Sequence, residues 1–193
     1  QLQYPLNEKS VDHALGVFRR ICDNYLEDSK IYFTVAPDKS YYLAGEEYPA
    51  MDYEALFRKI RTALPDTSYV NLTDLLTAQD YYRTDTHWRQ EKILDVAQKI
   101  ANAMGGQGPK EEDFTAQKLE DPFYGVYYGQ IALPVAGEDM FVLRSDVLDN
   151  CLVSYNGEEP VKGVYDWARS KVEMVAKPNG GYTIYGDMYE VFL

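Results

Sequence analysis

The feature of this sequence that most constrains its fold is an alternation of helix-like and strand-like segments over residues 10–106. Apolar residues recur at helical spacing in three segments and predict amphipathic helices, the first capped by Ser10. These segments are 11–26, 51–64 and 88–104. Two short segments between them are rich in β-branched and aromatic residues and predict buried strands at 30–36 and 68–72. Such alternation is typical of an α/β fold in which helices flank a parallel sheet.

After Gly108 the pattern changes to short strand-like segments separated by turn signals such as Asn156-Gly157. The predicted strands are 123–133, 139–144, 151–155 and 182–192. With 193 residues the chain is long enough for one domain with a sizeable core. We therefore expect a single α/β domain over 1–193, with an α/β core at 1–108 and an antiparallel β-rich insertion or meander at 109–193.

Charge and composition exclude several functions. The net charge is −12, and the basic residues form no dense block, which argues against binding to nucleic acid or to an anionic membrane surface. No segment approaches the roughly 20 apolar residues of a membrane span. The cysteines, Cys22 and Cys151, lie far apart in the sequence, as do the histidines, His13 and His87. No local cluster of metal ligands results, and we expect neither a metal nor a cofactor.

The sharpest candidate for chemistry is the pair Asp85 and His87, in the segment Y-Y-R-T-D-T-H-W at 81–88 just ahead of a predicted helix. In an extended segment, residues two apart point to the same side, so the carboxylate can reach the imidazole. An aspartate bonded to Nδ1–H fixes the tautomer and leaves Nε2 as a general base. The same pattern also fits an aspartate that caps the helix beside a partly buried structural histidine.

A nucleophile for such a base is not evident. None of the serines lies in a G-x-S-x-G or Gly-Asp-Ser-like turn. Ser145 comes nearest, and a turn or a helix cap explains it better. The 18 tyrosines include neighbouring pairs at 41–42, 81–82 and 127–128. They suit a carbohydrate-binding surface, although buried tyrosines with bonded hydroxyls explain many of them equally well.

Several blocks of the sequence resemble the DHHW family of Gram-positive envelope proteins and the wider SGNH-hydrolase-like group, which includes alginate O-acetylation proteins. The blocks are V-A-P-D-K at 35–39, Y-V-N-L-T-D-L-L at 69–76, Y-R-T-D-T-H-W at 82–88, F-Y-G at 123–125, V-Y-D at 164–166 and Y-G-D-M-Y-E-V-F-L at 185–193. Members of the DHHW family carry His at the position of Thr86, and the acetylation branch carries Thr. The resemblance implies a flavodoxin-like, SGNH-hydrolase-like parallel sheet, with His87 as base and Asp85 as its orienter.

In that family, the block matching 187–193 is followed by a glycine-rich turn, another strand and the nucleophilic serine. The resemblance therefore implies an incomplete domain, inactive as this fragment, whose sheet a second chain or segment completes. It implies a serine esterase or O-acyltransferase that acts on acetyl esters of cell-envelope polysaccharide, with Tyr82, Trp88 and Tyr124 as substrate contacts. The alternative is a non-catalytic envelope protein that binds a glycan or a protein partner through tyrosine-rich loops. Either would lie outside the cell or in the bacterial envelope, with any anchor in a segment not in this chain.

Overall fold

The chain forms two compact units. The computed structural model describes residues 5–45, 50–131, 134–154, 156–165, 174–176 and 182–184. Unit 1 comprises residues 1–80 and 95–108, and unit 2 comprises residues 81–94 and 109–193. The segment 81–94, which holds Asp85 and His87, therefore belongs with the later part of the chain.

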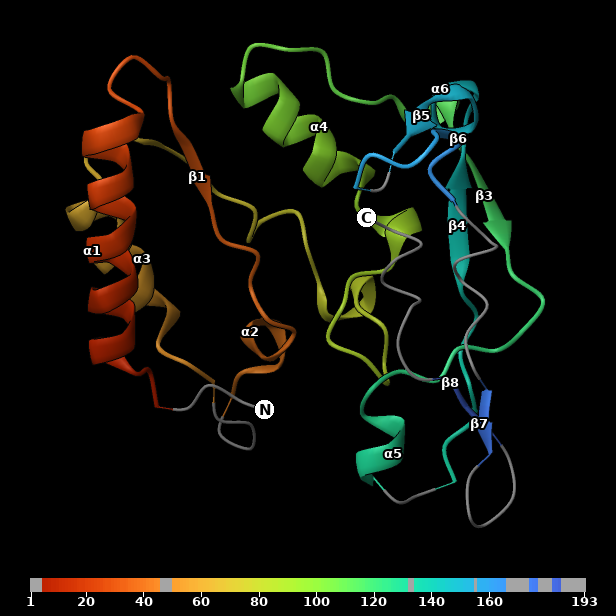
Figure 1. Cartoon of the computed structure of the whole chain (residues 1–193). Coiled ribbons are helices and arrows are strands. Elements are labelled where there is room, and N and C mark those ends of the chain that lie inside the picture. Colours follow the sequence, from red (N-terminus) through yellow and green to blue (C-terminus); the bar gives the residue numbers. More distant parts are fainter. Residues whose placement is uncertain are drawn as a thin grey trace. The chain divides into compact units, whose positions relative to one another are not determined.

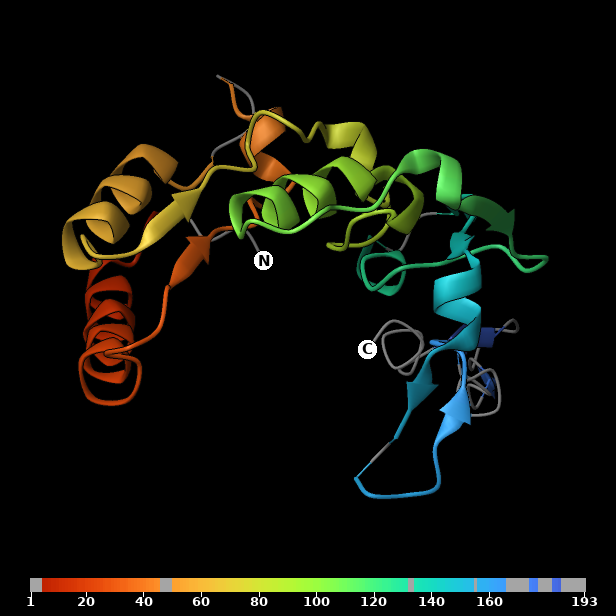
Figure 2. The ribbon, with the colours of Figure 1, turned by 90° about the horizontal axis from the view of Figure 1, so that it is seen from above.

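Unit 1 combines helices (Figure 1) with a parallel pair of strands. Its elements are α1 (Glu8–Tyr25), β1 (Tyr32–Thr34), α2 (Ser40–Leu43), α3 (Tyr53–Ala63), β2 (Ser68–Val70), the 3₁₀ turn η1 (Ala78–Asp80) and α4 (Leu94–Ala103). Strands β1 and β2 run side by side in parallel (Figure 2), with Phe33 opposite Tyr69. Parallel pairing of successive strands requires a crossover connection, and α3 provides it.

The apolar faces of α1 and α3 pack against each other and against β1. Leu15, Ile60 and Leu64 are buried, and half-buried apolar side chains such as Phe33 surround them. The helical spacing in the sequence thus marks the packed faces, although Phe18 and Ile21 of the α1 stripe remain 45% and 41% exposed. Helix α1 begins at Glu8, and its cap is Asn7, whose side chain accepts a hydrogen bond from the Ser10 amide at 3.1 Å. The prediction that Ser10 caps this helix was wrong by one turn.

Unit 2 is built from antiparallel strand pairs and short helices. Its elements are η2 (Gln90–Lys92), η3 (Glu111–Asp113), β3 (Thr115–Lys118), α5 (Tyr128–Ile131), β4 (Phe141–Arg144), α6 (Asp146–Asn150), β5 (Leu152–Val153), β6 (Val161–Lys162), β7 (Met174–Ala176) and β8 (Tyr182–Ile184). Strand β3 pairs with β4, β5 with β6, and β7 with β8, all antiparallel. Together with the parallel pair of unit 1, these pairs confirm a mixed α/β fold. Within the described residues every sheet has two strands, so the larger flavodoxin-like sheet is not seen there.

Two segments differ from their predicted structure. The predicted strand at 123–133 contributes one β-bridge, between Phe123 and Glu138, before the chain turns into α5. The predicted helix at 88–104 begins only at Leu94, since residues 90–92 form the 3₁₀ turn η2 instead. The side chain of Gln90 in this turn binds β4, where its Oε1 accepts from the Leu143 amide at 2.8 Å. The Tyr165 hydroxyl also donates to this Gln90 oxygen. The last part of the predicted strand 182–192 lies outside the described residues.

Candidate functional site

The segment that carries the aspartate and histidine is a tight loop. Tyr81 and Trp88 form an isolated antiparallel bridge, and their rings meet edge to face at a centroid distance of 6.4 Å. Inside this bridge, the Tyr82 amide donates to the carbonyl oxygen of His87 at 3.1 Å. Residues 82–87 are therefore bent rather than extended, and no helix begins at Asp85 within the described chain. The sequence prediction of an extended segment was therefore wrong, whereas helical structure does follow the segment, with η2 from Gln90 and α4 from Leu94.

The bend nevertheless brings the two side chains together. One carboxylate oxygen of Asp85, Oδ1, accepts a hydrogen bond from the backbone amide of His87 at 2.9 Å and lies 2.6 Å from His87 Nδ1. An aspartate that binds the amide two residues on is a common turn-forming arrangement. The Asp85 side chain is 0% exposed, whereas that of His87 is 56% exposed. The pair thus joins a buried anchor to an imidazole that reaches solvent.

A second segment, far away in the sequence, holds the other side of Asp85. The Val126 amide donates to Asp85 Oδ2 at 2.9 Å, and the Gly125 amide donates to Thr84 Oγ1 at 3.0 Å. The Tyr127 amide donates to the carbonyl oxygen of Thr84 at 2.9 Å. A Cβ atom at Gly125 would lie 2.3 Å from that carbonyl oxygen. Glycine is needed here because the two backbones touch, which explains the F-Y-G block at 123–125.

Glu138 binds the same loop from another direction. Its carboxylate accepts hydrogen bonds from the amides of Arg83 and Thr84, each at 2.8 Å, and from the Thr84 hydroxyl at 2.7 Å. Thr84 is 1% exposed. Sequence reasoning missed Glu138, Thr84 and the role of Gly125, because the contacts span 41 to 55 residues and nothing in the local pattern marks them.

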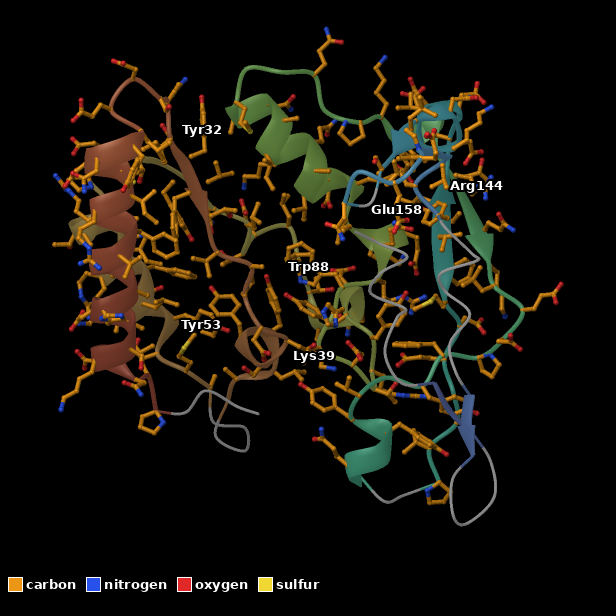
Figure 3. All side chains as sticks on the ribbon, viewed as in Figure 1. Tyr32, Lys39, Tyr53, Trp88, Arg144 and Glu158 are labelled. Carbon is orange, nitrogen blue, oxygen red and sulfur yellow. The ribbon has the colours of Figure 1, made fainter. Side chains whose placement is uncertain are left out.

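The three predicted substrate contacts fall in different surroundings. Tyr82 is 3% exposed and packs against Phe123 at a ring-centroid distance of 4.7 Å. Burial raises the pKa of its hydroxyl, and its position is that of a core residue. Trp88, labelled in Figure 3, is half-buried. Tyr124 is half-buried as well, and its ring lies 4.6 Å from that of Tyr128. Trp88 and Tyr124 retain accessible surface, and Tyr82 retains almost none.

The arrangement suits proton transfer. Because ionised Asp85 is an acceptor, Nδ1 of a neutral His87 carries the proton, and Nε2 is the nitrogen that accepts one. The Thr86 hydroxyl lies 3.2 Å from the same Nδ1. In the described part of the chain, no group of His, Cys, Asp and Glu side chains is arranged to hold a metal ion. None of the helices described there is long and apolar enough to cross a membrane.

Comparison with known proteins gives a likeness in fold. No family model and no curated protein matches the sequence. The structure is similar to that of PatB1 from Bacillus cereus, with a TM-score of 0.54 and 14% sequence identity over 93% of this chain. The chain spans 60% of the PatB1 chain. At this identity the likeness concerns the fold alone.

Proposed function

We propose that unit 2 carries the base and its orienter for an SGNH-like serine esterase or O-acyltransferase that acts on acetyl esters of cell-envelope polysaccharide. One observation carries the proposal: a fully buried carboxylate, Asp85, lies 2.6 Å from Nδ1 of a histidine that is more than half exposed. A buried carboxylate that fixes an accessible imidazole is the arrangement that activates a hydroxyl nucleophile.

The proposed reaction is acyl transfer through a serine. The serine hydroxyl attacks the acetyl carbonyl carbon while Nε2 of His87 takes the hydroxyl proton. The resulting imidazolium is stabilised by Asp85 and then gives its proton to the departing sugar oxygen. An acetyl-serine ester forms and the bond to the sugar breaks. Water or an acceptor hydroxyl then attacks the ester carbonyl while Nε2 of His87 takes its proton. The bond between the acetyl carbon and the serine oxygen breaks, His87 returns the proton to that oxygen, and the acetyl group leaves as acetate or as the new ester.

The serine itself is proposed on the family resemblance. In that family it follows the block that matches 187–193, on a strand of the larger parallel sheet. We therefore propose that a further segment or a second chain supplies the serine and completes a flavodoxin-like sheet. A location outside the cell or in the envelope belongs to the same proposal. Trp88 and Tyr124, both half-buried, are the side chains proposed to contact the sugar.

The test is acetyl-ester hydrolysis by the longest natural chain that contains these residues. Because a positioned general base contributes about 10²–10⁴-fold, His87→Ala should lower kcat by this factor with little change in KM. Asp85→Asn should lower kcat as well, because an amide no longer selects the Nδ1–H tautomer. His13→Ala is the matched control, since His13 is an exposed histidine of unit 1. Unchanged turnover in His87→Ala would refute the proposal.

Binding without catalysis is the second candidate, and the contact between the half-buried rings of Tyr124 and Tyr128 favours it. Aromatic rings of this kind can stack on sugar faces. The pair at 81–82 offers no such surface, since both tyrosines are buried. Under this reading, a cell-wall glycan still binds when Asp85 and His87 are both replaced, and Tyr124→Ala lowers the affinity. The absence of binding to any cell-wall glycan would count against it.

A further inference from the structure

We propose that Glu138 is a positioning residue, which holds the Asp85–His87 pair in its reactive arrangement. The inference rests on the proposed function of that pair. Glu138 is not expected to touch substrate or the reacting atoms. It acts on the loop that carries the pair, and the evidence is the set of donors that its carboxylate and its backbone bring together.

The first part of the evidence is the number of donors on one carboxylate. Oε2 of Glu138 accepts from the Arg83 amide at 2.8 Å. Oε1 accepts from both the amide and the hydroxyl of Thr84, at 2.8 and 2.7 Å. Hydrogen bonds to an ionised acceptor are about twice as strong as neutral ones. These three bonds therefore fix the backbone immediately before Asp85.

The second part is the backbone of Glu138, which holds the segment on the other side of the pair. Glu138 and Phe123 exchange two backbone hydrogen bonds, at 2.8 and 3.0 Å. Two residues after Phe123 the chain reaches Gly125, and the next amide, that of Val126, donates to Asp85 Oδ2. Glu138 thus fixes the position of two segments. One is the loop that carries Asp85, and the other is the segment whose Val126 amide completes the hydrogen bonding of the Asp85 carboxylate.

The Thr84 hydroxyl connects the two sides. It donates to Glu138 Oε1 and accepts from the Gly125 amide at 3.0 Å. A chain of this kind polarises each bond through the next. Valine has nearly the shape of threonine but can neither donate nor accept, whereas serine keeps both bonds. The two substitutions at Thr84 therefore separate the hydrogen bonds from the packing.

The arrangement uses Glu138 as an acceptor at both of its carboxylate oxygens. Glutamine would place an amide NH₂ group on one of the two positions that now accept, and either the Arg83 amide or the Thr84 donors would then face another donor. We expect the loop to relax and the carboxylate of Asp85 to move relative to Nδ1 of His87. The neutral imidazole would then no longer be held in the Nδ1–H form.

The experiment reads the ring nitrogens of His87 directly by NMR of the ¹⁵N-labelled chain, under alkaline conditions in which imidazoles are neutral. The sequence contains two histidines, and His87→Ala assigns their signals. In Glu138→Gln and Thr84→Val we expect the ratio of the Nδ1–H to the Nε2–H form of His87 to fall about tenfold, the effect of losing one charge-assisted hydrogen bond.

Two matched variants serve as controls. Asp139→Asn removes a neighbouring carboxylate that is 58% exposed and pairs with Lys118, and it should leave the ratio unchanged. Thr84→Ser should also keep it. Wild-type ratios in both Glu138→Gln and Thr84→Val would overturn the inference, as would the loss of the Nδ1–H form in Thr84→Ser.

Circular dichroism shows which variants fold. If Glu138→Gln does not fold, the comparison of Thr84→Val with Thr84→Ser decides alone. Loss of the fold in both Glu138→Gln and Thr84→Val would overturn the inference, because the contacts would then be a requirement of folding. The NMR measurement needs no turnover. Unchanged ester hydrolysis in His87→Ala would therefore refute the proposed function separately, without altering the tautomer result.

Discussion

Replacing Gly125 with alanine tests the contact on which the candidate site depends. The added Cβ would lie 2.3 Å from the carbonyl oxygen of Thr84 and 2.5 Å from Cβ of Asp85. The first obstacle is a backbone atom, which cannot rotate away as the end of a flexible side chain can. Ordinary van der Waals contact begins at 3.4 Å, so the two segments must separate by about 1 Å.

This separation breaks the hydrogen bonds that join the segments. The amides of Gly125, Val126 and Tyr127 now donate over 2.9–3.0 Å, and a further 1 Å or so takes them beyond hydrogen-bonding range. Two of the acceptors are neutral, at about 1 kcal/mol each, and the third is the Asp85 carboxylate, at about 1.5–3 kcal/mol. We expect Gly125→Ala to lower the free energy of unfolding of unit 2 by about 3–5 kcal/mol.

Urea denaturation followed by tryptophan fluorescence measures this change, because both tryptophans of the sequence lie in residues assigned to unit 2. Val126→Ala is the local control: it trims a side chain that is 48% exposed and keeps the amide that binds Asp85. It should change the free energy of unfolding by less than about 1 kcal/mol. If Gly125→Ala unfolded within about 0.5 kcal/mol of the wild type, the reasoning about close backbone contact would be refuted.

Three further predictions concern stability. Burial raises the pKa of Tyr82, so above about pH 10 the unfolded chain loses the hydroxyl proton while the folded chain keeps it. The free energy of unfolding should therefore fall as pH rises. Urea titrations between about pH 8 and 11 should show this slope, and Tyr82→Phe should flatten it. Gly16 lies inside α1, where an added Cβ meets nothing closer than an Arg20 side-chain nitrogen at 3.8 Å, so Gly16→Ala should raise the melting temperature, with a gain of about 0.5–1 kcal/mol. Asn7→Ala should lower the free energy of unfolding of unit 1 by about 1 kcal/mol, because it removes the side chain that caps α1. Ser10→Ala should lower it less, since the cap uses the backbone amide of Ser10 and not its side chain. Circular dichroism during thermal unfolding distinguishes the two variants.

The sequence predicted the parts of the fold that depend on local spacing. The apolar stripes of α1 and α3 and the branched and aromatic segments of β1 and β2 follow directly from burial of one face. Helix ends were less predictable, because both Asn7 and Ser10 are good capping residues and only the helix start selects between them. The segment 123–133 has the composition of a strand, but its described residues form a bridge at Phe123 and then the short helix α5.

Only the part of the candidate site formed by neighbouring residues, Asp85 and His87, was predictable from the sequence. Asp85 and His87 are two residues apart, so their proximity follows from almost any turn that the carboxylate stabilises. The supporting contacts come from residues near 125 and 138, and no periodicity or propensity connects segments so distant in sequence. Tyr82, predicted as a substrate contact, is 3% exposed, and its ring packs against that of Phe123, which lies 41 residues further along the chain.

The contrast in burial between Asp85 and His87 favours the interpretation of the pair as a general base and its orienter over that of a structural histidine beside a capping aspartate. A structural histidine is usually stabilised by burial of its ring, and a capping aspartate is usually exposed at a helix end. Here the aspartate is 0% exposed and the histidine side chain is 56% exposed. Burying a carboxylate costs free energy unless hydrogen bonds offset it, and both oxygens of Asp85 accept such bonds. A buried, hydrogen-bonded carboxylate beside one nitrogen of a solvent-exposed imidazole is thus easier to reconcile with the general-base interpretation than with a purely structural histidine.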